Sequence, residues 1–177
     1  SGALSYKVRY HGQKSPTGCR LGWLNHTIVH IASDMPKTQP LDFGGGKQPS
    51  STFMLFERII EDRGSKYSTS CGRVAGREDI LTFLKQLKSD KKYAKATHNS
   101  WAARITKDNV IYESKSDDGE TGAGAVILRV MQKSEVTNCI ICVTRWFGGT
   151  KLMGDRFKHL QDATTYAIKQ MDWAEPA

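Results

Sequence analysis

The sequence of 177 residues has no long apolar run and little cysteine. A membrane-spanning helix needs about 18 or more apolar residues in a row, and the N-terminus lacks the charged-then-apolar order of a secretory signal. The four cysteines, Cys19, Cys71, Cys139 and Cys142, are too few for a disulfide scaffold in a chain of this length. These absences predict a cytoplasmic protein with reduced thiols and no membrane contact.

The composition is that of a globular protein with a basic surplus. Hydrophobic residues make up 38% and charged residues 25% of the chain, which argues against disordered and fibrous classes. The formal net charge is +8, and residues 1–51 hold six basic and two acidic residues, so this part is more than twice as basic per residue as the rest. Such a surplus favours phosphate-rich or acidic partners by long-range attraction, but it identifies none.

A linker-like stretch between Asp34 and Ser51 divides the chain. Its three prolines and three consecutive glycines interrupt any apolar period. We therefore expect a basic N-terminal segment with a Pro/Gly linker over residues 1–51, and one folded domain over residues 52–177. Residues 21–33 fit neither a strand period nor a helix period, and both interpretations stay open.

The clear periodic patterns all follow the linker, and they alternate between the strand and helix types. In chain order they predict a hairpin (52–61 with 66–74), a helix (77–89), a second hairpin (98–105 with 110–113), a helix (about 123–133), a strand apolar on both faces (138–147) and a helix (about 153–171). The order predicts an α+β fold, a two-layer sandwich in which one mixed sheet of about five strands has its helices on one face.

Two glycine-rich turns, each leading into a predicted helix, supply the candidate ligand- or partner-binding residues. The first turn offers Asp117, Asp118, Gly119 and Glu120, and the second offers Arg145, Trp146, Phe147, Gly148, Gly149, Lys151, Gly154 and Arg156. Glycine lets a ligand approach the backbone, and free N–H groups at a helix start attract anions. The alternative is that the aspartates cap the helix and the glycines only shape the turns.

The same turns lack the patterns of a metal, cofactor or catalytic centre. Neither fits the phosphate-binding GxxxxGK[ST] spacing, and the carboxylates of the first turn have no second acidic cluster to complete a site. Cys139 and Cys142 form a lone CxxC on a predicted strand, where their side chains point to opposite faces, and zinc needs two more ligands. We therefore predict core thiols, no cofactor, no metal and no enzyme activity.

We expect the two turns to lie side by side at one end of the sheet, because each joins an element of the same layer to a helix start. The carboxylates of the first turn would then pair with Arg145 and Lys151 of the second. Such pairing is the structural alternative to a ligand site, and the sequence leaves both open.

The motifs resemble those of a known family. RWFGG at 145–149, within the run from Gly124 to Gly154, resembles the signature of the IMPACT family, known in bacteria as YigZ or UPF0029. SDDGE at 116–120 resembles its other hallmark, and GSKY at 64–67 lies where the family has a similar strand start. The resemblance covers about 120 of the 177 residues.

This resemblance implies a fold like domain 2 of ribosomal protein S5, and a non-enzymatic binding module that regulates translation in the response to amino-acid starvation. The implied partner is the ribosome-associated activator of the eIF2α kinase. One alternative is binding of RNA or the ribosome through Arg145, Trp146, Lys151, Arg156 and the basic first segment, and another is an enzyme that binds a phosphorylated small molecule. Residues 1–51 are fewer than the RWD domain of eukaryotic members, and the six residues after Met171 are fewer than the ferredoxin-like domain of bacterial ones.

Overall fold

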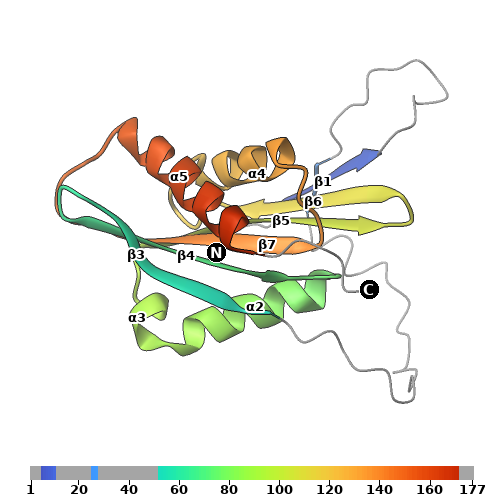
Figure 1. Ribbon diagram of the computed structural model, residues 1–177, viewed down its shortest axis with the longest axis horizontal. Helices are drawn as coiled ribbons and strands as arrows, with labels where there is room; N and C mark the ends of the chain where they lie inside the picture. The colour runs from blue at the N-terminus through green and yellow to red at the C-terminus, as the bar shows by residue number, and fades with distance from the viewer. Residues whose placement is uncertain (1–4, 11–24, 28–51, 172–177) are drawn as a thin grey trace.

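The computed structural model describes residues 5–10, 25–27 and 52–171 (Figure 1). The helices and strands are β1 (Ser5–Tyr10), β2 (Asn25–Thr27), β3 (Met54–Asp62), β4 (Ser65–Arg73), α2 (Arg77–Ser89), α3 (Lys91–Ala94), β5 (His98–Lys107), β6 (Val110–Ser116), α4 (Ala123–Lys133), β7 (Cys139–Trp146) and α5 (Asp155–Gln170). The predicted elements from residue 52 onward are confirmed, and α2 and α4 have the predicted bounds. The short helix α3 was not predicted.

Two tight turns close the predicted hairpins. Arg63 and Gly64 join β3 to β4 with φ angles of 46° and 81°, and Asp108 and Asn109 join β5 to β6 with φ angles of 51° and 60°. Positive φ at both central positions is the type I′ geometry, whose twist matches that of antiparallel strands. Gly64 adopts positive φ freely because it lacks a Cβ, and Asp108 and Asn109 tolerate it, which explains why the hairpins form where the sequence indicates.

The sheet has the strand order β2-β1-β6-β5-β7-β4-β3. Strands β3 to β7 are the five predicted strands, and the α+β class is confirmed. Every pair of neighbouring strands is antiparallel, so the predicted mixed pairing is wrong. The reason is that β7 enters between the two hairpins and runs opposite to both β4 and β5. From the first segment, β1 pairs with β6 along the edge.

Helices cover both faces of the sheet, so the predicted two-layer arrangement with helices on one face is also wrong. In Figure 1, α4 and α5 lie on one side of the sheet, and α2 and α3 lie on the other. The alternation of β7 explains this: Ile141 and Val143 pack with α4 and α5, while Ile140 and Cys142 pack with α2 and α3. A strand that is apolar on both faces needs cover on both.

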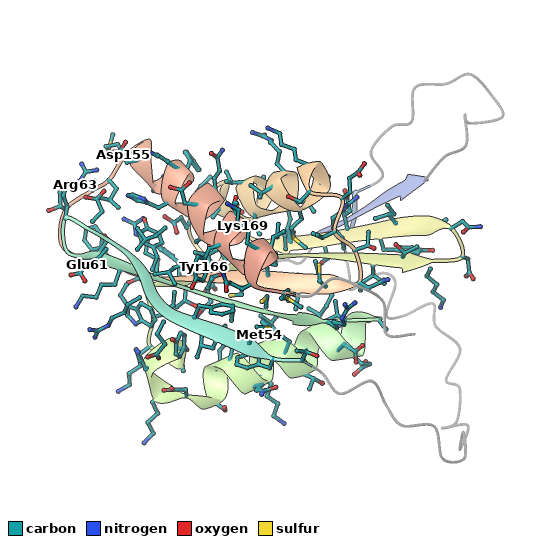
Figure 2. All side chains as sticks on the ribbon, viewed as in Figure 1. Met54, Glu61, Arg63, Asp155, Tyr166 and Lys169 are labelled. Atoms are coloured by element: carbon teal, nitrogen blue, oxygen red, sulfur yellow. The ribbon has the colours of Figure 1, made fainter. Side chains whose placement is uncertain are left out.

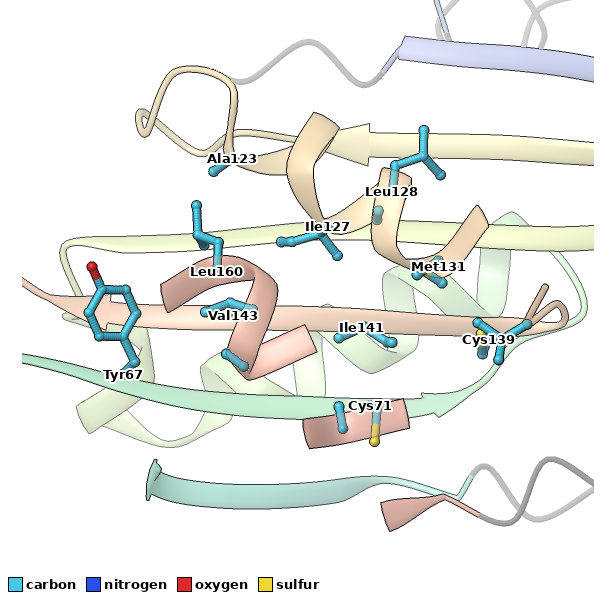
Figure 3. Packing of buried hydrophobic residues seen from close by; sticks show 14 of the residues in the cluster. Tyr67, Cys71, Ala123, Ile127, Leu128, Met131, Cys139, Ile141, Val143 and Leu160 are labelled. Carbon is cyan, nitrogen blue, oxygen red and sulfur yellow. The ribbon is translucent and has the colours of Figure 1, made fainter. Parts of the chain in front are cut away.

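The larger core lies between the sheet and the pair α4 and α5. Figure 3 shows Ile127 and Met131 of α4 and Leu160 of α5 over Ile141 and Val143 of β7. Large apolar side chains of this kind stabilise a fold by about 1.5–3 kcal/mol each when fully buried. This packing fixes the starts of α4 and α5, where the two glycine-rich turns lie. No helix among the described residues is long and apolar enough to cross a membrane.

Candidate functional site

The first turn, residues 116–124, is held by its own aspartates. The Asp117 carboxylate accepts hydrogen bonds from the backbone N–H groups of Gly122 at 2.9 Å and Gly124 at 2.8 Å, at the start of α4. The Asp118 carboxylate accepts from the Asn99 N–H at 2.8 Å, which ties the turn to β5. Asp117 therefore caps the helix, as the capping alternative expected, whereas Asp118 accepts from a strand residue. The carboxylates of both are directed at the protein's own backbone.

Glu120 forms a buried ion pair with Arg145 of β7. The Arg145 Nη1 donates to Glu120 Oε1, and the two side chains are only 7% and 1% exposed. Arg145 Nη2 lies 3.5 Å from Ser65 Oγ, and its guanidinium lies 5.5 Å from the centre of the Tyr67 ring. The prediction that the two turns converge is confirmed. The pairing expected for Lys151 is not formed, because its exposed side chain has no ion pair among the described residues.

The surroundings of this pair are strongly desolvated. Burial raises the pKa of Tyr67 to about 12, and the nearby guanidinium of Arg145 only partly offsets that shift. Within the part of the chain that the structure describes, Glu120 Oε2 and Arg145 Nε make no hydrogen bond to protein atoms. Removing one charge from such a pair leaves the other buried and unpaired, which is far more costly than losing a surface pair.

Gly148 of the second turn, residues 145–154, has a packing role. A Cβ atom at this position would lie 1.9 Å from the carbonyl carbon of Gly64 and 2.2 Å from the nitrogen of Ser65. The Gly148 N–H donates to Ser65 Oγ at 3.2 Å. Only glycine lets the end of β7 lie this close to the β3–β4 turn. Gly149 differs, because a Cβ there would meet nothing within 4 Å, although its φ of +90° favours glycine.

Trp146 lies on the opposite face of β7 from Arg145. Its indole Nε1 donates to the Lys92 carbonyl at 3.3 Å, and its ring meets Tyr93 edge to face at 5.2 Å. The adjacent Phe147 is 48% exposed, and its backbone N–H donates to Thr97 Oγ1 at 2.9 Å. Adjacent residues in a strand point to opposite faces. Arg145 and Trp146 therefore do not belong to one binding surface.

An open cleft of about 430 Å³ lies beside the second turn. It is lined by His98, Arg145, Phe147, Lys151, Leu152, Met153, Gly154, Arg156 and Phe157. Three of these side chains are cationic and none is a carboxylate. Phe147 and Met153 are exposed by 48% and 71%, the two highest values among the large apolar residues described, and they place two apolar contacts at the cleft. The cleft thus combines positive charge with accessible apolar surface.

The cleft also contains residues that the sequence pattern did not select. His98 Nδ1 lies 2.9 Å from the Asp118 carbonyl oxygen, which can only accept, so Nδ1 is the donor. Met153 has a positive φ of 50° in the turn before α5. His98 sits in a strand whose pattern indicated only pairing. For Met153, the one indication in the sequence was that an apolar residue lies within a glycine-rich turn.

The described cysteines are not arranged for nucleophilic or metal chemistry. Cys71, Cys139 and Cys142 are free and buried, and burial raises the pKa of each thiol to about 12. The reactive form of cysteine is the thiolate, so these groups are unreactive thiols near neutral pH. Cys139 and Cys142 pack on opposite faces of β7, as predicted. Across the described ranges, no group of three or more His, Cys, Asp or Glu residues could hold a metal ion.

Comparison with known proteins assigns the chain to a family. The sequence profile of the Impact N-terminal domain matches residues 63–168, a range that contains both glycine-rich turns. The Protein IMPACT homolog of Saccharomyces cerevisiae is 39% identical over 111 residues, which are 62% of this chain and 43% of that protein. This chain therefore belongs to the IMPACT family. It spans less than half the length of this curated relative.

Two solved structures resemble the chain. One, described as a hypothetical protein, has a TM-score of 0.57 at 22% identity, and the aligned region covers 68% of this chain and 62% of that one. This similarity supports the fold. The other, the two-domain translational regulator Yih1, is 32% identical with a TM-score of 0.49, covering 80% of this chain and 56% of its own.

Proposed function

We propose that this domain is a non-enzymatic binding module in translation control, and that it binds an acidic segment of a protein partner in the cleft. The observation that carries the proposal is the lining of the cleft, where the cationic Lys151 and Arg156 lie with the exposed apolar side chains of Phe147 and Met153. Arg145 also lines the cleft, but its charge is already paired with Glu120. An acidic segment with one apolar side chain would satisfy both features. It would place carboxylates near the cations and the apolar group against the rim.

The rigidity of the surroundings supports a binding role. The cleft adjoins the buried Arg145–Glu120 pair and the capped start of α4, and Arg156 stacks on the Phe157 ring with its guanidinium carbon 4.4 Å from the ring centre. Groups held in this way need little reordering when a partner binds, which favours affinity. Lys151, whose side chain is exposed, is the adaptable member of the set.

Family membership supports the biological setting. The IMPACT family is associated with control of translation under amino-acid starvation, and its implied partner is the ribosome-associated activator of the eIF2α kinase. We propose that partner for this chain, in the cytoplasm. The binding surface for it would be the cleft, because the first turn has directed its charges at its own backbone and at Arg145.

The test compares Lys151→Glu and Phe147→Ala with Lys158→Glu. Lys158 is exposed on α5 but does not line the cleft, so it matches the charge change. The affinity of the purified chain for the kinase activator of the same organism is measured by calorimetry. We expect the two cleft variants to bind at least about tenfold more weakly, the control to bind within about twofold, and all unfolding free energies to stay within about 0.5 kcal/mol of the wild type.

Equal weakening by Lys151→Glu and Lys158→Glu would show that only net charge matters and would contradict the proposal. Unchanged affinity in both cleft variants would exclude the cleft as the contact surface. The salt dependence separates the RNA alternative, because RNA binding by the cleft weakens by orders of magnitude between about 50 and 200 mM salt, while a contact with apolar area weakens much less.

A further inference from the structure

The densest positive charge of the described chain lies outside the two glycine-rich turns, on and beside α2 and α3. Residues 85–95 contain five lysines and one aspartate, a net charge of +4 in a chain whose formal net charge is +8. All five lysines are exposed, and they are Lys85, Lys88, Lys91, Lys92 and Lys95. One half of the net charge is therefore concentrated in eleven residues.

The fold directs this charge outward on the face opposite the cleft. Ile80, Phe83 and Leu87 of α2 are buried against the sheet. Lys85 and Lys88 lie three positions apart on the remaining, exposed side of the helix, about 4.5 Å apart along its axis. Buried Tyr93 anchors α3 in the same way. Figure 1 shows α2 and α3 together below the sheet, away from α4 and α5.

Within the described ranges, one of these five lysines is paired with an acidic residue. Lys92 pairs with Glu57 at 2.7 Å and lies 5.7 Å from the centre of a Trp146 ring. The Asp90 carboxylate caps α3 by accepting from the Lys92 N–H at 2.8 Å. Among the described residues, the other four lysines form no ion pair. We call Lys85, Lys88, Lys91 and Lys95 the lysine ridge.

We propose that the lysine ridge binds the phosphate backbone of nucleic acid without reading its sequence. Lysine binds phosphates as a point charge without fixed geometry, which suits contacts that do not depend on sequence. It is also depleted from the cores of protein interfaces, where aromatic residues and arginine supply the anchors. Beside the ridge, Leu81 is 39% exposed, and no other large apolar residue of α2 or α3 is exposed. A membrane or protein partner would need more apolar contact than this.

The ridge is distinct from the residues that the sequence suggested for RNA binding. Those were Arg145, Trp146, Lys151, Arg156 and the basic segment of residues 1–51, most of which lies outside the described residues. Of these, Arg145 is buried in an ion pair and Trp146 packs against α3. The ridge and the cleft lie on opposite faces of the sheet, so the proposal stands independently of the protein-binding function. Both surfaces are accessible in the same molecule.

The test substitutes glutamine for the four ridge lysines and compares this variant with a matched control. The control carries Lys107→Gln, Lys133→Gln, Lys158→Gln and Lys169→Gln, which remove the same charge from exposed positions elsewhere. Fluorescence anisotropy with a labelled 20-nucleotide oligouridine measures affinity between about 50 and 200 mM salt, with a DNA oligomer of the same length alongside. Circular dichroism confirms that each variant is folded.

We expect the ridge variant to lose at least about tenfold in affinity at low salt, and its logarithmic salt slope to fall by up to about 3, since each single-strand phosphate contact contributes about 0.7. The control should lose less than about threefold. Comparable affinity for RNA and DNA identifies the phosphate backbone as the shared ligand. Equal losses in both variants, no binding by the wild-type chain, or binding to anionic lipid vesicles without binding to either oligomer would each overturn the proposal.

Discussion

The two glycine-rich turns look alike in the sequence and differ in what their side chains contact. In the first turn, the charges of Asp117, Asp118 and Glu120 are satisfied by backbone N–H groups and by Arg145. In the second, Phe147 and Lys151 project from the surface. The difference follows from chemistry, because short carboxylate side chains can accept from nearby backbone N–H groups, whereas a long ammonium side chain only donates and extends into solvent. In this protein, the basic turn before a helix therefore indicates an accessible surface, whereas the acidic turn indicates contacts within the fold.

The largest expected effect tests the link between the turns. Arg145→Ala leaves Glu120 buried and unpaired, so we expect the free energy of unfolding to fall by about 3–5 kcal/mol, measured from the urea midpoint. Replacing both partners, as Arg145→Met with Glu120→Leu, should recover much of this loss because no unpaired charge remains. A single variant within about 0.5 kcal/mol of the wild type would show that the pair does not join the turns.

The next effect concerns the glycines of the second turn. Gly148→Ala places a methyl group against the backbone of Gly64 and Ser65, and we expect a loss of about 2–3 kcal/mol from overpacking. Gly154→Ala is the matched control, because a Cβ there meets nothing within 4 Å and its φ is −64°. This control should be neutral or stabilising by up to about 1 kcal/mol. Thermal unfolding of both variants decides whether close packing, rather than glycine content, fixes the turn.

The smallest expected effect comes from the acid side of the pH–stability curve. Arg63 and His159 hydrogen-bond to Asp62 and lower its pKa from 3.8 to about 2. In Figure 2, Arg63 and Asp155 lie close together at the end of the β3–β4 hairpin, and they form an ion pair. A lowered carboxyl pKa stabilises the fold above its unfolded value, and this contribution is lost as the pH falls from about 4 to about 2.

Asp62→Asn should therefore flatten the stability curve between pH 4 and pH 2, with urea unfolding at several pH values as the measurement. His159→Asn, which removes one of the two hydrogen-bonding partners of Asp62, should flatten it less. An unchanged acid limb in the Asp62 variant would show that the hydrogen bonds of this carboxylate do not stabilise the fold.

Most of the fold from residue 52 onward was predictable because its elements have strong periods. Ile80, Phe83 and Leu87 recur on one face of α2, and they are the buried residues of that helix. Helix α3, Lys91–Ala94, is too short to show a period. Strand direction does not affect side-chain alternation, which is why the antiparallel pairing of β7 with the two predicted hairpins was missed. The apolar side chains on both faces of β7 did indicate that helices cover both faces of the sheet, because Ile140 and Ile141 point to opposite faces and each must be buried.

The position of the site could be predicted from the sequence better than the residues that form it. That Arg145 meets the acidic turn follows from the topology, and the pair with Glu120 confirms it. The sequence could not show that Arg145 pairs with Glu120 rather than with Asp117 or Asp118. The pairing depends on the distance between the first turn and β7 and on which carboxylate side chain is long enough to span it. His98 entered the cleft by strand pairing, where it lies opposite Arg145 on β7. A residue placed by a partner strand 47 positions away leaves no local pattern.

The position of β7 between the two hairpins has a consequence for the order of events during synthesis. Each hairpin closes from neighbouring residues within microseconds, but β4 and β5 pair on their inner edges only with residues 139–146. About 65 residues separate the end of β4 from the start of β7, which a ribosome needs several seconds or more to add. During that interval the inner edge of β4 is unpaired, and once β5 has been made its inner edge is unpaired too, so both are open to other extended chains until β7 arrives. The arrival of one late strand thus converts two separate hairpins into a single sheet.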